Sequence, residues 1–402
     1  MISDALGWNF GQSFMSPQTI IPMFIARLTG SNLIIGLVVA IQSFGQLVPQ
    51  LFSAHRLGDL HIKKFFVTFV GIVFERLPYL ILALAVLFSP SSSLILTIFL
   101  ICWSVSNLFT GINLPAYMSL FGKSVPYRLR GRVTGIGSSI GTFLAAGGAY
   151  AAKLFLERSS SLNGYAWCFL SGFVVLTITI IPLAFTDEPA EEKKEQQQKL
   201  NIFLKGLFAS IRSNTQFIRY LFLQIFMQAG YVGVAFITSY VIKQLKVSEG
   251  TVAVCTMVLM ASMALSSLFF GYIGDRFGYR IVFIFAALFS TAAYAVSAIY
   301  PSLMIIYGVY VLAGLLLGCI AVTHNMTFDF CSQEQYSTYP AIVFTANMPV
   351  RIFFPLLAGF LADAAGLRIV FIIIAASSLI GLALALFFVR DPRHDLPREF
   401  SP

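Results

Sequence analysis

The chain has 402 residues, of which 58% are hydrophobic and only 11% are charged. This composition excludes an ordinary soluble protein and indicates an all-α polytopic membrane protein. The formal net charge of +9 does not indicate a nucleic-acid partner, because the basic residues fall at the predicted membrane edges.

Apolar runs long enough to cross a bilayer as α-helices, which takes about 20 residues, recur along the whole chain. In the first half we predict spans at 4–27, 32–54, 65–88, 93–121, 132–156 and 165–186. In the second half we predict spans at 216–241, 250–272, 281–300, 302–328, 338–362 and 368–389. The first ten residues lack the basic region and cleavage site of a signal peptide, so we expect the first span to be retained.

Two polar segments complete the predicted organisation. Residues 187–215 form a cytoplasmic linker, whose strongly polar first part is too hydrophilic to pack. Its second part has apolar residues at helical spacing, which predicts an amphipathic helix on the membrane surface. The predicted domains are 1–186, 187–215, 216–389 and a cytoplasmic tail, 390–402.

The distribution of Lys and Arg predicts the orientation in the membrane. An even number of spans places both termini on one side. The loops and termini on that side hold seventeen of the 26 basic residues, and the opposite loops hold six. Because cytoplasmic loops are enriched in Lys and Arg, we expect both termini in the cytoplasm.

A charged, glycine-punctuated segment at 271–280 connects the eighth and ninth spans. A related sequence, Leu57-Gly58-Asp59 followed by two lysines, lies 216 residues earlier, and a third copy occupies 359–368. At the same offset Gln12 falls on Gln228, and Asn113 falls on Asp329. These matches indicate a duplicated protein with inverted three-helix repeats within each half.

The segment 271–280 resembles the loop motif G-x-L-A-D-R-x-G-R-R of the major facilitator superfamily of secondary transporters. The first copy is degraded, with His55, Leu60 and Ile62 at motif positions. The resemblance implies two six-helix bundles, related by pseudo-twofold symmetry, that work by alternating access around a central site. In the fifth span, Gly137, Gly141 and the pair 147–148 are better explained by close helix packing than by an antiporter motif.

The charged loop has two interpretations. It can fix topology, because its basic residues hold the loop in the cytoplasm. Alternatively, as the resemblance implies, it is a conformational latch in which Asp59 and Asp275 pair with arginines such as Arg132. The candidate gating residues are Asp59, Arg132, Gly274, Asp275, Arg276, Gly278 and Arg280.

Polar residues inside apolar spans are candidates for a substrate site, because polarity in a membrane is costly. Asn9, Gln12 and Ser16 share one face of the first span, and Gln224, Gln228 and Tyr231 share one face of the seventh. The candidate substrate-binding residues are Asn9, Gln12, Ser16, Asn107, Asn113, Gln224, Gln228, Tyr231, His324, Asn325, Asn347 and Arg351. The alternative for each is a hydrogen bond between helices.

Five ionisable residues lie well inside predicted spans: Glu75, Arg76, Lys153, Asp329 and Arg351. Each needs a partner or water. Arg351 is the main candidate for a substrate contact or counter-ion, because Asn347 lies one turn away on the same face. Glu75 and Asp329 are the candidates for coupling to protons. The third span is usually peripheral in this fold, which favours a structural role for Glu75 and Arg76.

The sequence contains no pattern for catalysis, a metal ion or a cofactor, and its five cysteines form no CxxC pair. We therefore expect a transporter rather than an enzyme, in a bacterial inner membrane, acting as a monomer among membrane lipids. Its substrate is a small organic solute, for which an amphipathic, drug-like molecule fits, and protons are a candidate coupling ion. A lipid or lysolipid flippase of the same fold and a non-transporting sensor are the alternatives.

Overall fold

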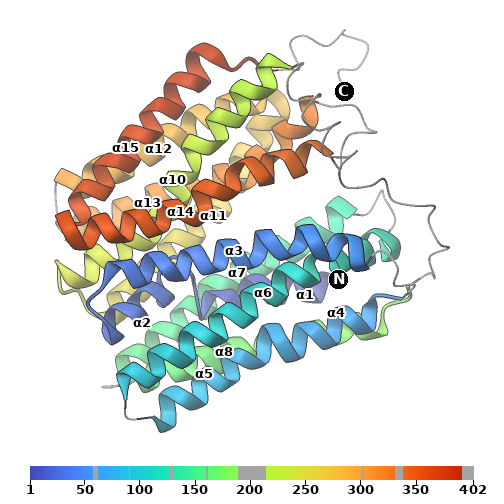
Figure 1. The fold of residues 1–402 in the computed structure, drawn as a ribbon, viewed down its shortest axis with the longest axis vertical. Coiled ribbons are helices and arrows are strands. Elements are labelled where there is room, and N and C mark those ends of the chain that lie inside the picture. Colours follow the sequence, from blue (N-terminus) through green and yellow to red (C-terminus); the bar gives the residue numbers. More distant parts are fainter. Residues whose placement is uncertain are drawn as a thin grey trace. The chain divides into compact units, whose positions relative to one another are not determined.

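The computed structural model describes residues 1–57, 62–89, 91–125, 130–159, 162–188, 214–299, 303–330 and 338–391. All the regular elements of these residues are helices (Figure 1). The first half contains α1 (Ile2–Ser13), α2 (Ile20–Leu28), α3 (Asn32–Leu57), α4 (Lys64–Val70), the π-helix η1 (Gly71–Arg76), α5 (Leu77–Phe88), α6 (Ser92–Ser124), α7 (Arg130–Arg158), α8 (Asn163–Ile180) and the 3-10 helix η3 (Ile181–Phe185).

The regular elements that the structure describes in the second half are also helices. It contains α10 (Thr215–Lys243), α11 (Glu249–Phe277), α12 (Tyr279–Ile299), α13 (Leu303–Thr323), the 3-10 helix η4 (His324–Phe330), α14 (Thr338–Ala365), α15 (Leu367–Ala383) and the π-helix η6 (Leu384–Phe388). The predicted cytoplasmic helix in the linker and most of the tail lie outside the described residues.

Among the described residues, ten helices are long and apolar enough to cross a membrane. The two other predicted spans, 4–27 and 132–156, do not meet both criteria. The first is divided into two short helices, and in α7 many glycines and serines dilute the apolar residues. The protein is therefore a multi-pass helical membrane protein, as the sequence predicts.

The first span is interrupted between Ser13 and Ile20, where the sequence predicts a continuous helix. Pro17 explains the break, because proline has no N–H to donate and its ring clashes with the preceding turn. Threonines of α10 and α11 form hydrogen bonds with the interrupted segment. The carbonyl of Gln18 accepts a hydrogen bond from Thr238, and the hydroxyl of Thr19 accepts one from Thr256.

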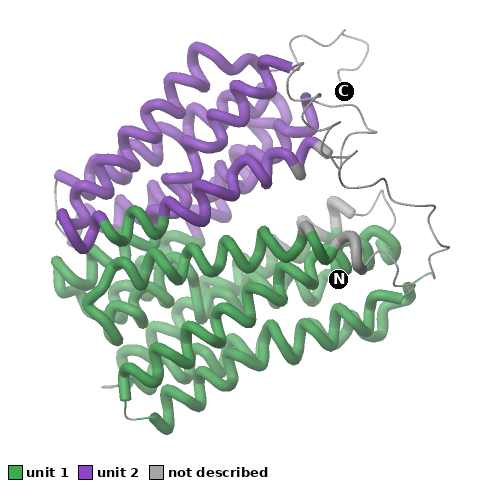
Figure 2. Tube along the Cα trace, viewed as in Figure 1, with its two compact units in different colours: residues 1–197, 235–260, 355–360 green, residues 198–234, 261–354, 361–402 purple. Residues whose placement is uncertain are grey.

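The chain splits into two compact units (Figure 2). Unit 1 comprises residues 1–197, 235–260 and 355–360, and unit 2 comprises 198–234, 261–354 and 361–402. Unit 1 therefore includes the end of α10 and the beginning of α11. There Arg27 forms an ion pair with Glu249, and Asn32 accepts hydrogen bonds from Ser239 and Lys243.

Close helix contacts in unit 1 depend on glycine. A Cβ atom on Gly141 of α7 would lie 2.8 Å from the carbonyl oxygen of Leu6 in α1. A Cβ on Gly111 of α6 would lie 2.1 Å from the carbonyl oxygen of Gly45 in α3. The close packing predicted for the glycine-rich fifth span is thus confirmed.

Two of the predicted loop copies have the same backbone geometry. Gly278 joins α11 to α12 with φ of +90°, and Gly366 joins α14 to α15 with φ of +89°. Both values lie in the left-handed region that glycine adopts without strain. This shared corner supports the assignment of 271–280 and 359–368 as copies of one motif.

Candidate functional site

The third span contains a widened turn at its centre. Pro78 follows the π-helix Gly71–Arg76 and cannot donate a hydrogen bond to the carbonyl one turn earlier. An extra residue in the turn accommodates this loss, as is usual for π-bulges at functional sites. The side chains of both Glu75 and Arg76 are consequently buried.

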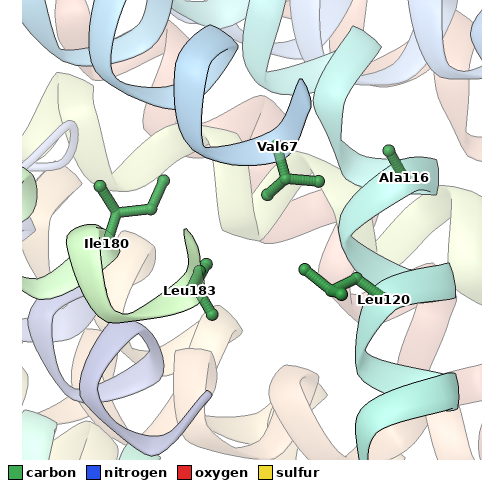
Figure 3. Close-up of a cluster of buried hydrophobic side chains, with 5 residues drawn as sticks. All are labelled: Val67, Ala116, Leu120, Ile180 and Leu183. Atoms are coloured by element: carbon green, nitrogen blue, oxygen red, sulfur yellow. The ribbon is translucent and has the colours of Figure 1, made fainter. Parts of the chain in front are cut away.

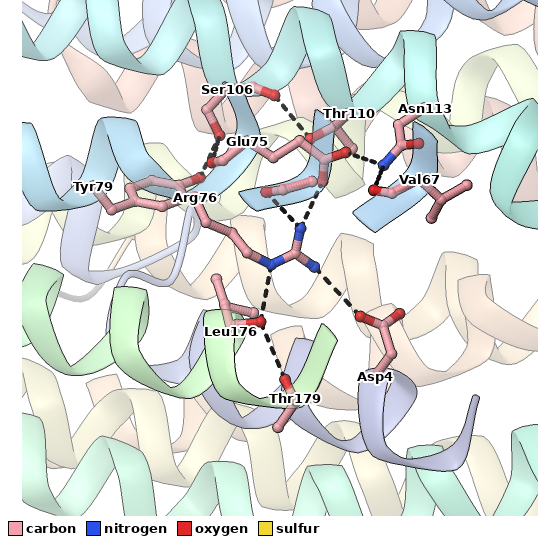
Figure 4. Close-up of polar contacts among 11 residues, drawn as sticks. Asp4, Val67, Glu75, Arg76, Tyr79, Ser106, Thr110, Asn113, Leu176 and Thr179 are labelled. Carbon is pink, nitrogen blue, oxygen red and sulfur yellow. Dashed lines mark hydrogen bonds and ion pairs between the residues drawn. The ribbon is translucent and has the colours of Figure 1, made fainter. Parts of the chain in front are cut away.

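The guanidinium of Arg76 is held from four directions (Figure 4). Its Nε donates to the carbonyl of Leu176 in α8 at 2.9 Å, and its Nη1 donates to the carbonyl of Gly71 at 2.9 Å. Nη1 also contacts the Glu75 carboxylate at 3.3 Å, and Nη2 contacts Asp4 of α1 at 3.4 Å. Arg76 thus links the first, third and sixth spans.

Glu75 has further partners on the fourth span. Its carboxylate accepts a hydrogen bond from Asn113, which also donates to the carbonyl of Val67 at 3.2 Å. The Glu75 carbonyl accepts from Ser106 at 2.7 Å, and the Ser106 hydroxyl lies 3.0 Å from that of Tyr79. Polar groups of α6 therefore fix the position of Glu75 as firmly as its own helix does.

A cavity of about 260 Å³ lies beside these charges, entirely within unit 1. It is lined by Asp4, Ala5, Trp8, Asn9, Val67, Glu75, Arg76, Thr110, Asn113, Leu114, Tyr117 and Ile180. Val67 and Ile180 also belong to an apolar cluster with Ala116, Leu120 and Leu183 (Figure 3). This cluster borders the cavity on one side, so the charges face a small space next to dry packing.

The buried side chains of the cluster carry more negative than positive charge. Asp4, Glu75 and Arg76 are 7%, 5% and 3% exposed, and two carboxylates share one guanidinium. The positively charged Met1 amino group lies near Asp4, and the Tyr117 side chain is hydrogen-bonded to the Asp4 carboxylate. Because an uncompensated buried charge is costly, a carboxylate of this cluster whose cationic partner moves away favours binding a proton or another small cation.

The polar face of the first span contacts this cluster in the N-terminal turns of α1. Asn9 lines the cavity, although its amide donates to the Ala5 carbonyl of its own helix at 3.0 Å. Gln12 is hydrogen-bonded to Tyr79. Ser16 lies in the interruption of the helix, where its hydroxyl donates to Gln18 at 3.4 Å. The predicted stripe is therefore divided between the cavity and the helix break.

On the fourth span, Asn107 and Asn113 have different surroundings. Asn113 belongs to the charged cluster, as described above. Asn107 donates to the Trp103 carbonyl at 2.9 Å and accepts from Gln46 of α3 at 3.1 Å. Asn107 thus makes the interhelical hydrogen bond that was the alternative to substrate contact.

In the second half, the lower part of α10 carries a neutral hydrogen-bonded chain. Gln224 donates to the Tyr220 hydroxyl at 2.8 Å, and that hydroxyl lies 2.8 Å from the hydroxyl of Thr327 in η4. Asp329, which is on the same 3-10 helix as Thr327, lies near Tyr220 of α10. Gln228 is buried one turn above Gln224.

Arg351 of α14 stacks on the ring of Tyr231, with its guanidinium carbon 4.9 Å from the ring centroid. Its Nε is buried without a hydrogen-bond partner in the described part of the chain, and so is the Oδ1 of Asn347. His324 lies near Arg351 and packs on Phe344, with ring centroids 5.7 Å apart. The structure thus places three predicted residues of unit 2, Tyr231, His324 and Asn347, near the Arg351 guanidinium.

The loop at 271–280 forms its own contacts. Tyr279 donates a hydrogen bond to Asp275 and accepts one from Asn325 at 3.0 Å, which moves Asn325 away from the Arg351 group. Arg280 donates to the carbonyls of Ala385 and Leu386 at 2.8 and 2.6 Å.

Two further loop residues have local contacts. Arg276 donates to the hydroxyl of Tyr272 at 3.0 Å. Gly274 packs on the ring of Tyr279, which a Cβ atom there would approach to 2.4 Å. Asp59 lies outside the described residues, as does the side chain of Arg132, so the predicted latch stays a prediction.

Sequence reasoning missed Asp4 and its partner Tyr117. Asp4 was assigned to the membrane edge as the first residue of a span, although Asp4, Trp8 and Gln12 follow one another at four-residue steps. That spacing places Asp4 on the polar face of the helix and could have identified it. Among the described residues, no group of three or more His, Cys, Asp or Glu side chains is arranged to hold a metal ion.

The sequence model of the Major Facilitator Superfamily matches residues 6–241 and 220–401, which together cover nearly the whole chain. The chain belongs to the Major Facilitator Superfamily. The protein is thus a secondary transporter with the fold that the loop motif predicts. A search of curated proteins finds no match.

Solved structures of superfamily transporters have the same fold. A D-xylose–proton symporter superposes with a TM-score of 0.72 at 15% identity, over 98% of this chain and 97% of that one. A bacterial homologue of the human lysosomal transporter Spinster, in an inward-facing unoccupied conformation, gives 0.70 at 14% identity, over 96% and 95%. A variant of the nucleoside transporter NupG gives 0.70 at 13% identity, over 96% and 98%. These likenesses show the fold.

Proposed function

We propose that this superfamily member is a proton-coupled transporter of a small organic solute, located in a bacterial inner membrane with both termini in the cytoplasm. The observation that carries the proposal is the buried cluster of Asp4, Glu75 and Arg76 beside a cavity. Two carboxylates around one guanidinium can hold one exchangeable proton without a metal or cofactor.

The proton has a physical reason to move with the conformational cycle. Arg76 bridges α1, η1 and α8, so a rearrangement of these helices changes its distance from Asp4 or Glu75. A carboxylate that loses its guanidinium in a dry environment binds a proton, and it releases the proton when the pair forms again. Solute movement by alternating access is thereby coupled to proton movement.

The first test measures proton binding directly, because Trp8 lines the same cavity as the two carboxylates. In a background with Trp103→Phe and Trp167→Phe, Trp8 is the remaining tryptophan of the three in the chain. We expect its fluorescence in detergent to titrate with pH and the titration to disappear in Asp4→Asn with Glu75→Gln. A fluorescence signal that does not respond to pH, or an unchanged titration in the double variant, would contradict the proposal.

The second test measures coupling in proteoliposomes that contain a trapped pH dye. A panel of radiolabelled carboxylates, sugars, nucleosides and amines is added outside, and lumenal pH and solute are followed together. We expect at least one solute to move with protons in the wild type, and Glu75→Gln to retain solute exchange but to lose proton movement. Glu157→Gln, at the half-exposed ion pair with Lys153, is the control that should behave as wild type.

A transporter with solute flux but no proton flux would reduce the proposal to facilitated transport. Movement of labelled lysolipid in the same vesicles, without movement of any water-soluble solute, would replace it with the flippase alternative.

A further inference from the structure

Arg351 differs from the other cations of unit 2. The other arginines that the structure describes there, Arg219, Arg276, Arg280, Arg368 and Arg390, lie at or near helix ends. Arg351 lies at the middle of α14, where the lipid would surround an isolated helix. A charge at this depth needs an opposite charge or water.

Among the ion pairs of the described residues, none involves Arg351. Its guanidinium is stacked on Tyr231, an arrangement that holds its plane in place but does not neutralise it. Within the described chain, the buried Nε of Arg351 has no acceptor. The Oδ1 of Asn347, one helical turn away, has no donor among the same residues. The fork of a guanidinium, positioned in this way, lacks the planar anion that it matches best.

We infer that Arg351 binds the carboxylate of a monoanionic organic substrate; this inference rests on the proposed function and names its substrate class. One unpaired cation selects one negative charge, which favours a monocarboxylate over a phosphate dianion. The Tyr231 ring lies against the Arg351 guanidinium and the Phe344 ring lies against His324, so an apolar or aromatic body finds aromatic surface near the carboxylate.

The inference assigns a different part of the cargo to each unit. The first carries a proton on its surplus carboxylate, and the second carries the anion on its surplus guanidinium. Their combined cargo is electrically neutral, so its movement transfers no net charge across the membrane potential.

The experiment compares matched probes on detergent-purified protein by thermal shift: benzoate, benzamide and benzylammonium, then phenylpropionate and its amide, with chloride as a simple anion. We expect saturable stabilisation of the wild type by the carboxylates and none by the amides or the amine. The variant Arg351→Gln should lose this stabilisation. Arg351→Lys should retain it with roughly tenfold weaker affinity, because an ammonium keeps the charge but not the fork.

Arg368→Gln is the matched control, since it removes an exposed arginine of the same unit at a helix end. It should bind the carboxylates as the wild type does. Circular dichroism and size-exclusion profiles of all variants establish that each is folded, and Arg351→Lys keeps the test valid if the neutral variant is not.

Amides that stabilise as well as carboxylates, or no carboxylate effect at all, would overturn the inference. Equal, Arg351-dependent stabilisation by chloride would assign the residue to a counter-ion site instead. The proposed function fails separately: carboxylates that bind at Arg351 but are not carried into vesicles with protons would remove coupling and leave the binding site. Proton-driven flux of neutral solutes that is unchanged in Arg351→Gln would support the proposed function and contradict the carboxylate site.

Discussion

The two halves of the chain place different chemistry at equivalent positions. With the 216-residue offset, Asp4 falls on Tyr220, Glu75 on Thr291 and Arg76 on Ala292. In the first half these positions form a buried ionic cluster beside a cavity. In the second half, Tyr220 takes part in a neutral chain of hydroxyl and amide groups. At these positions of the described chain, the first half carries buried paired charges and the second half carries neutral residues.

The helix backbone differs at the same place. Pro78 falls on Tyr294, and the π-turn of the third span has as its counterpart a continuous α-helix, Tyr279–Ile299. Tyr294 donates to the carbonyl of Gly230 at 2.6 Å and packs where proline would leave a gap. The comparison teaches that the charges and the widened turn occur together, because the turn directs two adjacent side chains into one interior.

The largest expected effect comes from removing the cation of the first half. Arg76→Ala leaves two buried carboxylates without a partner and should lower the free energy of unfolding by about 3 to 5 kcal/mol. Thermal unfolding in detergent measures the change. A triple variant, Asp4→Asn, Glu75→Gln and Arg76→Gln, is neutral at these three positions, as the second half is at the equivalent ones, and should recover most of the loss. If it is no more stable than Arg76→Ala, charge balance is not what the cluster provides.

A smaller effect is expected at the corner glycines of the second half. Gly278→Ala should cost roughly 2 to 3 kcal/mol, because it combines left-handed backbone strain with a Cβ placed against Asp391. Gly366→Ala has the same strain but nothing within 4 Å, so it should cost about 1 to 2 kcal/mol. The difference between the two unfolding temperatures isolates the packing of the first corner. Equal losses of stability in the two variants would show that the Asp391 side chain moves aside at no measurable cost.

Gly71 tests the widened turn itself. A Cβ there would lie 2.7 Å from Nη1 of Arg76 and 2.4 Å from Cδ1 of Ile180, so Gly71→Ala should cost roughly 2 kcal/mol through overpacking. Gly308→Ala, which meets nothing within 4 Å in an ordinary α-helix, is the control and should be neutral or slightly stabilising. An unchanged melting temperature and an unchanged Trp8 titration in Gly71→Ala would mean that the guanidinium is not confined as described.

The smallest effect is expected in the neutral chain of the second half. Tyr220→Phe removes hydrogen bonds with Gln224 and Thr327 and should cost about 0.6 kcal/mol, the average for such bonds in membranes. It should leave proton movement in vesicles unchanged. A loss of coupling as large as that of Glu75→Gln would show that the second half also handles protons.

The sequence predicts the helical fold and its family because apolar length and the glycine-punctuated loop are local features. It also identifies Glu75 and Arg351 as charged residues whose position inside a membrane span is energetically unfavourable. It does not predict their partners, since the direction of Glu75 and Arg76 depends on a π-turn that shifts the helical periodicity. Asp4 was missed because a charge at the end of a span looks like an interfacial residue until its contact with Arg76 is known.

The interruption at Pro17 gives the first span two sets of neighbours. Before Pro17 in the chain, α1 packs on α7 and α8. After Pro17, α2 packs on α3 and α6. In the short connection between the two segments, the Gln18 carbonyl accepts a hydrogen bond from Thr238, and the Ser16 and Thr19 carbonyls accept backbone N–H groups. The segment that carries Asp4 is therefore not continuous with the segment that packs on α3 and α6. Motion of a single short helix would then be enough to open or close the contact between Asp4 and Arg76.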